Sequence, residues 1–411
     1  MQTYLVGGAV RDALLGLPVK DRDWVVVGAT PEQMLDQGYT QVGADFPVFL
    51  HPNTKEEYAL ARTERKAGHG YTGFEVHFAP VVTLEDDLLR RDLTINAMAQ
   101  AEDGTLIDPY QGQEDLEKRL LRHVSDAFQE DPLRVLRVAR FAARFDALGF
   151  DVAEETLALM RAMVANGELN YLVPERIWQE MSRALLEPSP DIFFCVLRRC
   201  GALKVIMPEL DALFGVPQPM RWHPEIDTGI HTLKALQQAA AMSDRLEVRF
   251  ATLCHDFGKG MTNPEYWPSH RGHEGLGADS IAKLANERRW PKHLARLAEQ
   301  TARYHTHCHK ISELRADTLV RTLEKLNAFR QPQNFEDFLI ACESDARGRS
   351  GLEQQPYPQA DKFRACLRAC QSVDPQSLIA EGYQGAELGE ALHQARIRAV
   401  KTEKQSWSTS D

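Results

Sequence analysis

The chain has 411 residues, of which 43% are hydrophobic and 26% charged, and its mean hydropathy is −0.39. At roughly 150 residues per domain, this length predicts two or three domains and excludes a peptide or a single small module. The 48 basic and 59 acidic residues give a formal net charge of −11, which is the wrong sign for nonspecific coating of nucleic acid. Any nucleic-acid contact is therefore expected at a local basic patch.

The first residues and the cysteines bear on cellular location. Residues 1–8 contain neither a basic segment nor an apolar one of the kind that directs export, so we expect a cytoplasmic protein with no membrane partner. Seven cysteines are present, and the pairs Cys195/Cys200 and Cys366/Cys370 lack the Cys-x2-Cys spacing of a zinc knuckle. Reduced thiols without a chemical role are therefore expected.

The first hundred residues have a mixed α/β pattern. Short β-rich runs between Gly, Pro and Asp turns predict one small sheet. The runs cover residues 4–6, 24–27, 48–50, 57–61 and 74–79. The glycine-rich stretch 66–73 predicts a mobile loop between strands.

Helical periodicity dominates from residue 85 onward. Apolar residues recur at three- and four-residue spacing over 86–99, 114–124, 132–145 and 154–165. The Pro- and Gly-rich segment 215–224 predicts an ordered connector, where we place the main domain boundary. Further helical patterns follow it, over 232–242, 247–254, 278–288, 294–304, 316–327 and 335–346, and residues 401–411 predict a frayed polar tail. The predicted fold class is α+β, a small mixed sheet followed by an all-helical remainder.

A pair of glycines and a pair of aspartates give the first chemical signal. Gly7 and Gly8 follow a predicted strand and precede a helix start, where backbone N–H groups can approach a phosphate, although such a pair is more often only a tight turn. Asp21 and Asp23 follow Gly8 by 13 and 15 residues. In a strand, residues two apart share a face, and paired carboxylates suit Mg2+ completed by triphosphate oxygens.

Two further motifs make the pattern specific. In chain order, the four motifs are Gly7-Gly8-Ala9-Val10-Arg11-Asp12, Asp21-Arg22-Asp23, Arg90-Arg91-Asp92-Leu93-Thr94-Ile95-Asn96-Ala97 and Glu130-Asp131-Pro132-Leu133-Arg134-Val135-Leu136-Arg137. This set resembles the ordered motifs of class II tRNA nucleotidyltransferases, the CCA-adding enzymes of the polymerase-β-like superfamily. The related bacterial poly(A) polymerases share the full set.

The resemblance implies roles in nucleotidyl transfer for the earlier motifs. It implies that Asp21 and Asp23 are catalytic and hold Mg2+ that activates the RNA 3′-hydroxyl and neutralises the triphosphate. Gly8, Arg11 and Arg91 are implied to contact the phosphate or sugar of the incoming nucleotide, as a glycine turn and cations can.

The later motifs are implied to brace the site and to select the base. Asp92 and Asn96 are expected to brace the segment around Arg91, with a salt-bridged helix end as an equal alternative. Asp131 is a natural N-cap before a proline. The resemblance nonetheless implies that Asp131 and Arg134 hydrogen-bond the base edge of CTP or ATP, since a carboxylate accepts from an exocyclic amine and an arginine donates to ring nitrogen or carbonyl oxygen.

A stripe of arginines continues the same predicted helix. Arg137, Arg140 and Arg144 follow Arg134 at spacings of three and four residues, which places them along one slowly winding face. In an acidic protein, we expect this stripe to bind nucleotide phosphates rather than to form a solvated face. Arg176, Arg198, Arg199 and Lys204 are either further phosphate contacts or solvated surface.

A second set of chemical residues lies in the histidine-rich half. His255 and Asp256 end an apolar run, His231 lies 24 residues before His255, and Asp345 lies in a later helical segment. The order His, His-Asp, Asp resembles the HD phosphohydrolase superfamily, a helical domain whose four ligands hold a divalent metal. The resemblance implies hydrolysis of phosphoesters, and imidazole with carboxylate suits Ni2+, Mn2+ or Co2+ better than Ca2+.

Several neighbouring polar residues have less certain roles. His273 and His305 could enlarge the metal site. Lys259 either contacts phosphate or forms a helix-end salt bridge. Three other histidines are expected at the surface, namely His270, His307 and His309.

An HD domain behind a CCA-adding head resembles the arrangement of gammaproteobacterial CCA enzymes, and the resemblance then spans nearly the whole chain. It implies addition of C, C and A to tRNA 3′ ends from CTP and ATP. It also implies phosphatase, 2′-nucleotidase and 2′,3′-cyclic phosphodiesterase activity in the HD domain. The alternatives are a bacterial poly(A) polymerase and a catalytically inactive RNA-binding protein.

The same arrangement predicts four regions. They are a nucleotidyltransferase head with the start of the nucleotide-selecting neck over 1–140, a helical RNA-binding neck and body over 141–224, the HD domain over 225–350, and a helical C-terminal region with a polar tail over 351–411. The loop 66–73 is a candidate for the movement that switches selection from C to A. A monomer and a homodimer both fit the sequence.

Overall fold

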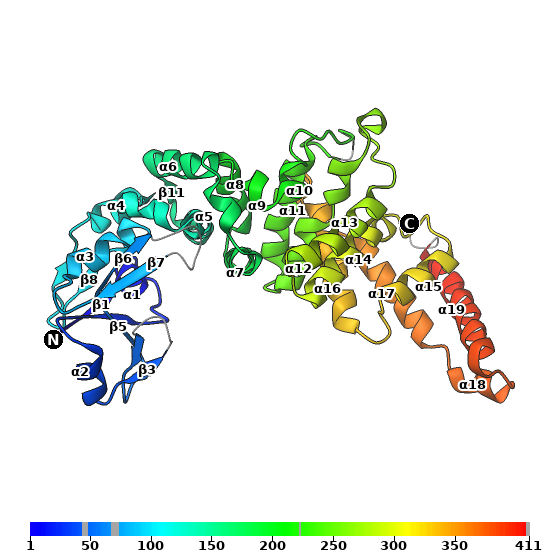
Figure 1. Cartoon of the computed structure of the whole chain (residues 1–411). Coiled ribbons are helices and arrows are strands. Elements are labelled where there is room, and N and C mark those ends of the chain that lie inside the picture. The colour runs from blue at the N-terminus through cyan, green and yellow to red at the C-terminus, as the bar shows by residue number, and fades with distance from the viewer. Residues whose placement is uncertain (43–47, 67–73, 222, 408–411) are drawn as a thin grey trace. The chain divides into compact units, whose positions relative to one another are not determined.

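The computed structural model describes residues 1–42, 48–66, 74–221 and 223–407 (Figure 1). It divides the chain into two compact units, Met1–Ile206 and Met207–Asp411. The expected connector 215–224 therefore lies inside the second unit, where Thr228 N donates to Val216 O and Lys259 Nζ donates to Gln218 Oε1. The expected loop 66–73 lies, apart from its first residue, outside the described residues.

The first unit is built on a mixed sheet of seven strands in the spatial order β3-β4-β5-β2-β1-β8-β9. β1 (Gln2–Val6) pairs antiparallel with β2 (Asp23–Val27), which pairs parallel with β5 (Glu57–Leu60). The remaining strands of this sheet are β3 (Thr40–Val42), β4 (Val48–Leu50), β8 (Ala99–Gln100) and β9 (Leu106–Ile107). Two small sheets accompany it, β6 (Arg62–Lys66) with β7 (Phe74–Phe78) and β10 (Leu120–Leu121) with β11 (Asp151–Val152). All five predicted β-runs are strands, but the last pairs with β6 instead of joining the main sheet.

Both faces of the main sheet are covered by apolar side chains. Val25 packs in one buried cluster with Val6 and Leu88, whereas Val26 packs in another with Met34. Successive residues of a strand point to opposite faces, so adjacent valines of β2 belong to different layers. By the same alternation, Asp23 at the start of β2 shares the face of Val25.

Helices form the rest of the first unit. They are α1 (Gly8–Leu14), α2 (Pro31–Asp36), α3 (Leu84–Leu89), α4 (Gly112–Lys118), α5 (Leu133–Phe145), α6 (Glu154–Ala165), α7 (Pro174–Leu185), α8 (Pro190–Arg199) and α9 (Leu203–Ile206), with short 3-10 turns η2 (Thr94–Asn96), η3 (Asp126–Glu130), η4 (Asp146–Leu148) and η5 (Glu168–Tyr171). α5 packs against α7 and α8. This packing anchors the helix that carries the arginine stripe.

Two helices expected in the first unit are shorter in the structure. The segment 86–99 is not one helix, because α3 ends at Leu89 and Asp92 Oδ1 accepts hydrogen bonds from Leu93 N and Asn96 Nδ2, both at 2.9 Å. Such a side chain offers the backbone an alternative to the helical pattern. The segment 114–124 is also broken, since Arg119 adopts a positive φ of 59° and the following residues form β10.

All strands and bridges of the described chain except one isolated bridge lie in the first unit, and the second unit is helical. Its helices are α10 (Pro208–Asp211), α11 (Thr228–Met242), α12 (Leu246–Cys254), α13 (His273–Glu287), α14 (Lys292–His309), α15 (Ala316–Lys325), α16 (Pro332–Arg347), α17 (Pro358–Gln371), α18 (Pro375–Ala380) and α19 (Gly385–Trp407), with the 3-10 turns η6 (Phe257–Met261) and η7 (Pro264–Tyr266). The predicted α+β class is thus confirmed.

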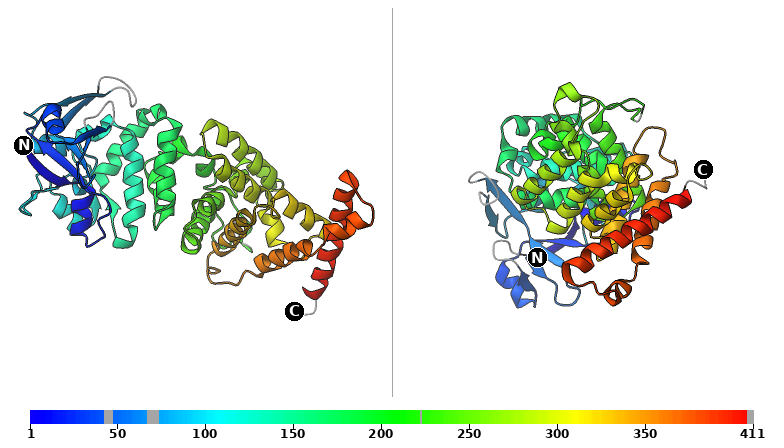
Figure 2. Two further views of the ribbon diagram at one scale, coloured as in Figure 1. Left: turned by 90° about the horizontal axis from the view of Figure 1, so that it is seen from below. Right: turned by 90° about the vertical axis from the view of Figure 1, so that its right-hand side faces the viewer.

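The C-terminal helix α19 packs along α15 and α17 (Figure 2). It continues through the segment expected to be a frayed tail, because Lys404 Nζ donates to the carbonyls of Ser312, at 3.1 Å, and Leu314. The last four residues lie outside the described part of the chain. No helix in that described part combines the length and the apolar character that a membrane span requires.

Two candidate active sites

Residues from all four N-terminal motifs line one cavity of about 750 Å³ in the first unit. Every catalytic and nucleotide-binding residue predicted for this half borders it, namely Gly8, Arg11, Asp21, Asp23, Arg91, Asp131, Arg134, Arg137 and Arg140. Five further arginines also line it, which are Arg62, Arg90, Arg144, Arg176 and Arg183. With ten arginines and four aspartates in its lining, the cavity concentrates positive charge in an acidic protein and suits a polyanion.

The two glycines make room for guanidinium groups. Gly7 has a φ of 68°, and a Cβ there would lie 2.9 Å from Arg91 Nη1. A Cβ on Gly8 would lie 3.4 Å from Arg11 Nη2. The paired glycine thus permits both a backbone turn and close approach of two cations.

The paired aspartates border the same cavity, with Asp23 opening β2 and Asp21 preceding the strand. Burial raises the pKa of Asp23, Arg91 lowers it, and the neighbouring charge of Asp21 raises it further. The pair therefore disfavours two negative charges unless a cation joins them. Two carboxylates facing a cavity fit a hard divalent ion such as Mg2+.

Arg11 is buried within a network that ties the first helix to the third motif. Its Nε donates to Asp12 Oδ1 at 2.8 Å, its Nη1 donates to Asn96 Oδ1, and its guanidinium lies 5.0 Å from the Phe145 ring centroid. Asp12 also accepts from Arg144 Nη2 at 2.8 Å. α1 and α5 therefore share a single buried charge network.

Asp92 joins the third motif to the fourth. Its Oδ2 accepts from Arg137 Nε at 2.8 Å, while its Oδ1 accepts from Leu93 N and Asn96 Nδ2. Burial opposes ionisation, but Arg137 and Asn96 outweigh it and hold the pKa of Asp92 well below its ordinary value. Asp92 and Asn96 thus contact each other as expected of bracing residues, and Asp92 also forms an ion pair with Arg137, the salt bridge that was the equal alternative.

This network predicts acid-sensitive stability. A depressed carboxyl pKa contributes stability that is complete above the unfolded-state pKa of about 3.9 and is lost as the pH falls below it. Asp92→Asn leaves the Arg137 guanidinium, which is 35% exposed, without its buried partner, at a cost of about 1–3 kcal/mol. In scanning calorimetry of the full chain, the melting temperature of Asp92→Asn is expected to lie below that of wild type. This difference in melting temperature is expected to be fully present at pH 7 and pH 5 and to narrow below pH 4. Asp36→Asn, at the exposed end of α2, is the control, and a pH-independent gap would contradict the assignment.

The arginine stripe of α5 is not a solvated face. Arg134 and Arg140 are each 8% exposed. Arg134 donates to the carbonyls of Ala127 and Arg90 at 2.8 and 2.6 Å, and Arg140 Nε donates to the buried Glu180 at 2.7 Å. These contacts fix the direction of each guanidinium before any ligand arrives.

Asp131 also pairs with an arginine whose role the sequence left open. Its Oδ2 accepts from Arg176 Nη2 at 3.0 Å, and its Oδ1 accepts from Leu133 N at 3.0 Å. The second contact is the N-terminal capping interaction expected at this position. Arg176 stands 45 residues away in the sequence, so only the packing of α7 on α5 shows its place in the cavity.

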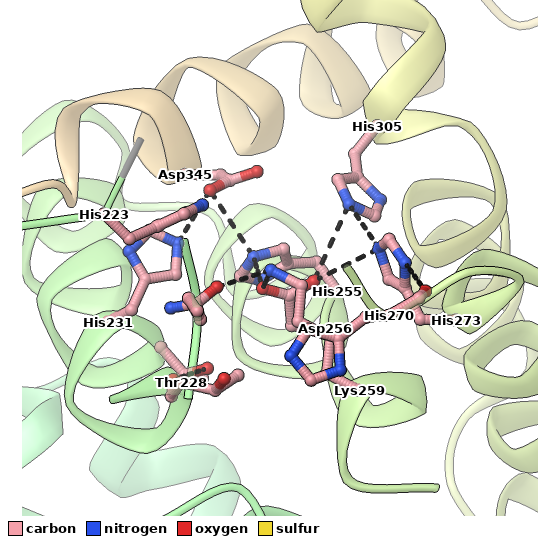
Figure 3. Close-up of polar contacts among 12 residues, drawn as sticks. His223, Thr228, His231, His255, Asp256, Lys259, His270, His273, His305 and Asp345 are labelled. Atoms are coloured by element: carbon pink, nitrogen blue, oxygen red, sulfur yellow. Dashed lines mark hydrogen bonds and ion pairs between the residues drawn. The ribbon is translucent and has the colours of Figure 1, made fainter. Parts of the chain in front are cut away.

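The second unit brings the four residues of the HD pattern together (Figure 3). His231 lies on α11, His255 and Asp256 follow α12, and Asp345 lies on α16, all at most 4% exposed. His231 Nε2 is 2.8 Å from Asp345 Oδ1, and His255 Nε2 is 3.5 Å from the same oxygen. His255 Nε2 also lies 3.1 Å from Asp256 Oδ2.

The electrostatics of this group fit a bound cation. Burial lowers the pKa of His255, but the carboxylates of Asp256 and Asp345 outweigh it and raise that pKa to about 10. Burial opposes ionisation of Asp256 and Asp345 as well, yet the facing histidines hold both pKa values well below the ordinary range, and Lys259 lowers that of Asp256 further. Among the described residues, His255 Nε2 and Asp256 Oδ1 are buried without a hydrogen-bond partner. Buried donors of this kind are the expected ligands of a divalent transition ion.

Lys259 forms the salt bridge that was one of its two expected roles. Its Nζ lies 2.7 Å from Asp256 Oδ2 and 2.6 Å from Gln218 Oε1. Lys259 also lines a cavity of about 480 Å³ that opens onto this group. It is therefore placed for the second role too, contact with a phosphate in the cavity.

A pair of glycines sets the distance between η6 and α13. A Cβ on Gly258 would collide with the carbonyl oxygen of His273 and lie 2.6 Å from Gly277 N. A Cβ on Gly277 would in turn lie 3.0 Å from Gly258 N. The two elements thus meet backbone to backbone.

His223 and Glu225 lie beside the residues of the HD pattern, and neither was predicted from the sequence. Glu225 Oε1 lies 3.1 Å from His223 Nδ1 and 3.0 Å from His231 Nδ1, although the latter contact lacks hydrogen-bond geometry. Both histidine contacts lower the pKa of Glu225, against the effect of burial. The segment 223–225 precedes α11 and reads as connector, so its composition gave no sign of a site.

Three histidines expected at the surface are partly or fully buried. His270 is 2% exposed, with Nε2 2.7 Å from Pro217 O. His307 Nδ1 lies 2.9 Å from Thr322 Oγ1. His309 Nε2 lies 2.7 Å from Asp345 Oδ2, and Tyr357 Oη lies 2.8 Å from His309 Nδ1. His309 follows His305 by one helical turn, a spacing that places both on one face and was a usable signal.

Known protein families match three successive segments of the chain. Residues 3–122 match the poly A polymerase head domain, residues 149–214 match the probable RNA and SrmB-binding site of polymerase A, and residues 228–338 match the HD domain. Solved structures share the fold. They include the Bacillus stearothermophilus CCA-adding enzyme in complex with CTP (TM-score 0.63, 24% identity, 98% of this chain and 89% of that one) and the Thermotoga maritima CCA-adding enzyme complexed with tRNA (TM-score 0.64, 19% identity, 100% and 91%).

Curated relatives match over nearly the full length. The multifunctional CCA protein of Hahella chejuensis is 63% identical over 405 residues, which are 98% of this chain and 96% of the relative. That of Thioalkalivibrio sulfidiphilus is 61% identical over 407 residues, 99% and 100% of the two chains. A head with its charged cavity, a helical metal-ligand cluster, and identity at this level and coverage lead to one conclusion: the chain belongs to the multifunctional CCA protein family.

Proposed function

We propose that the chain adds C, C and A to tRNA 3′ ends from CTP and ATP in the first unit and hydrolyses phosphoesters in the second. The observation that carries the first activity is the cavity in which Asp21 and Asp23 face the arginines of α5. The second activity rests on the buried cluster of His231, His255 and Asp345 beside Asp256. A cytoplasmic location, where tRNA would be available, belongs to the proposal.

For nucleotide addition, Mg2+ held by Asp21 and Asp23 would neutralise the triphosphate and activate the RNA 3′-hydroxyl. The chain's own residues position the nucleotide. Gly8 gives close approach to the backbone, Arg11 and Arg91 present guanidinium groups at the glycine turn, and Arg137 and Arg140 supply positive charge along α5. Asp131 and Arg134, at the start of that helix, would read the base edge.

For hydrolysis, a divalent transition ion on His231, His255, Asp256 and Asp345 would activate water and polarise the phosphate. Ni2+, Mn2+ and Co2+ all suit these ligands. Lys259 and His309 border the adjoining cavity and would bind phosphate oxygens. Such a site would act as phosphatase, 2′-nucleotidase and 2′,3′-cyclic phosphodiesterase on RNA ends and nucleotides.

The test of the combined function uses the full chain. Incubation with tRNA lacking CCA, labelled CTP and ATP is expected to incorporate two C and one A and then stop. Extension of generic RNA with ATP alone, without a stop, would indicate a poly(A) polymerase. Incorporation of neither nucleotide together with no hydrolysis of 2′,3′-cyclic AMP would indicate a catalytically inactive RNA-binding protein.

Base selection gives a further prediction. Arg134→Lys keeps the charge but loses the planar fork that reads ring nitrogen and carbonyl oxygen. A good bidentate contact contributes about 1–3 kcal/mol of discrimination, roughly 5- to 150-fold. The ratio of kcat/KM for CTP to that for UTP is expected to fall by this factor in single-nucleotide addition. Arg161→Lys, at an exposed position of α6, is the matched control, and an unchanged ratio in Arg134→Lys would remove Arg134 from base selection.

A further inference from the structure

Part of the cavity in the second unit carries positive charge that the proposed hydrolysis does not use. Among the described residues, four lysines and arginines and two carboxylates border this cavity of about 480 Å³. Lys259 and Arg347 are each paired with a carboxylate outside the lining, at 2.7 and 2.6 Å. In the part of the chain that the structure describes, Arg349 and Lys310 have no side-chain hydrogen bond or ion pair. These two cations are therefore open to an anion in the cavity.

Main-chain contacts on both sides of Arg349 hold it about one helical turn beyond Asp345. Arg349 follows Asp345 by four residues, just past the end of α16. The preceding Gly348 packs directly on α11, since a Cβ there would lie 2.6 Å from the main chain of that helix. The next residue, Ser350, donates from its backbone N to Glu225 Oε2 at 3.2 Å. The start of the arginine side chain is thus fixed before a ligand binds.

The surroundings of Arg349 favour an anionic ligand. Its side chain is half-buried, and its Nε is buried without a hydrogen-bond partner among the residues described. A partly buried cation with open N–H donors is unfavourable unless an anion accepts from them. Lys310 follows the last residue of α14 and adds an exposed positive charge to the same lining. Among the described lining residues, Glu313 and Asp345 are the only carboxylates, so positive charge prevails.

The size and the remaining lining of the cavity suit a nucleoside. Its volume of about 480 Å³ lies within the range of roughly 300–1,000 Å³ for pockets that enclose a whole small molecule, and one phosphate group would not fill it. Leu352 and Pro356 add apolar side chains to the lining. Gln359 also borders the cavity, and its Oε1 is buried without a partner among the described residues. This oxygen can accept a hydrogen bond from the exocyclic amine of a base.

We propose that this part of the cavity binds the terminal nucleoside of an RNA 3′ end, with Arg349 and Lys310 holding the phosphodiester on its 5′ side. The preferred substrate is then an RNA end that carries a terminal phosphate and a phosphodiester one nucleotide away, instead of a mononucleotide with a single phosphate. This inference rests on the proposed phosphohydrolase function and deepens it. Contacts to a phosphodiester remote from the reacting atoms lower KM and leave kcat unchanged when they are equal in the ground state and the transition state.

The test compares 2′,3′-cyclic AMP with the dinucleotide ApA that ends in a 2′,3′-cyclic phosphate. With the full chain and Mn2+, kcat/KM for the dinucleotide is expected to exceed that for 2′,3′-cyclic AMP at least about tenfold, through a lower KM. The dinucleotide presents one more phosphate. Its kcat/KM is therefore expected to fall more steeply with salt, with a log–log slope more negative by about 0.7.

Substitutions at position 349 show whether the preference arises at this arginine. Arg349→Gln is expected to lower the ratio of kcat/KM for the dinucleotide to that for 2′,3′-cyclic AMP about tenfold, and to remove the difference in salt slope. Arg349→Lys keeps the charge and is expected to retain the difference in salt slope. Arg368→Gln, at an exposed position of α17 outside the cavity lining, is the matched control and is expected to leave the ratio and the slopes unchanged.

Equal kcat/KM for the two substrates in wild type would overturn the phosphodiester site while sustaining the phosphohydrolase function, and so would an equal loss for both substrates in Arg349→Gln. The wild-type comparison needs no substitution, so an unstable variant does not weaken it. If wild type hydrolyses neither substrate, isothermal titration with the same two ligands decides. Tighter binding of the dinucleotide that Arg349→Gln removes would sustain the phosphodiester site without the activity, and equal binding would overturn both proposals.

Discussion

Asp21→Asn and Asp23→Asn are each expected to lower CCA addition at least about a thousandfold. Each substitution keeps the side-chain shape and removes one charge from the pair that would hold Mg2+. Loss of about 4 kcal/mol of metal-based stabilisation corresponds to about three powers of ten in rate. Single-turnover addition of labelled CMP to tRNA lacking CCA, at saturating Mg2+, measures the effect.

The controls for this prediction separate chemistry from folding. Asp36→Asn removes an exposed carboxylate of the same unit and is expected to retain full activity. Hydrolysis of 2′,3′-cyclic AMP is expected to be unchanged in all three variants, since the proposed metal ligands of the second unit are untouched. If Asp21→Asn and Asp23→Asn still add CMP at the wild-type rate, the two carboxylates are not the metal site.

Substitutions in the second unit are expected to abolish hydrolysis and to spare CCA addition. His255→Gln and Asp256→Asn should lower hydrolysis of 2′,3′-cyclic AMP at least about a thousandfold and leave CCA addition intact, because each would remove a ligand of the ion proposed to activate water. His255→Gln is the cleaner variant. Asp256→Asn leaves the buried Lys259 without its negatively charged partner, 2.7 Å away, at a stability cost of about 3–5 kcal/mol.

Calorimetry of the same preparations shows whether a loss of hydrolysis is a loss of fold. His293→Gln is the matched control and is expected to hydrolyse normally. Loss of CCA addition in a folded His255→Gln variant would contradict the independence of the two activities.

Much of the first unit could be predicted because its strands are local patterns. The run Trp24 to Val27 is apolar and β-branched, and the structure makes it β2. The two-residue strands β8 to β11 have no such pattern, since their pairing depends on distant segments. The break after Leu89 could not be predicted from periodicity, because it depends on Asp92 bonding to its own neighbouring backbone.

The site residues that could be predicted are those that lie close together in the sequence. Short motifs such as Gly7-Gly8 and His255-Asp256 were visible because their residues are adjacent in sequence. Arg183, Glu225 and Tyr357 were missed because they reach their cavities or contacts only through helix packing. His309 was wrongly expected at the surface because its side chain is polar. In the structure, Asp345 and Tyr357 contact its two ring nitrogens.

The contact between Gly258 and α13 makes the residues around Asp256 more sensitive to some substitutions than to others. Asp256 and His273 sit on two stretches of main chain that touch directly, so their separation depends on atomic radii that no neighbouring side chain can alter. Substitutions that change the size of the surrounding core side chains would therefore leave this separation unchanged. A single methyl group at position 258 would force the two stretches apart and move Asp256 away from His273 without replacing either side chain.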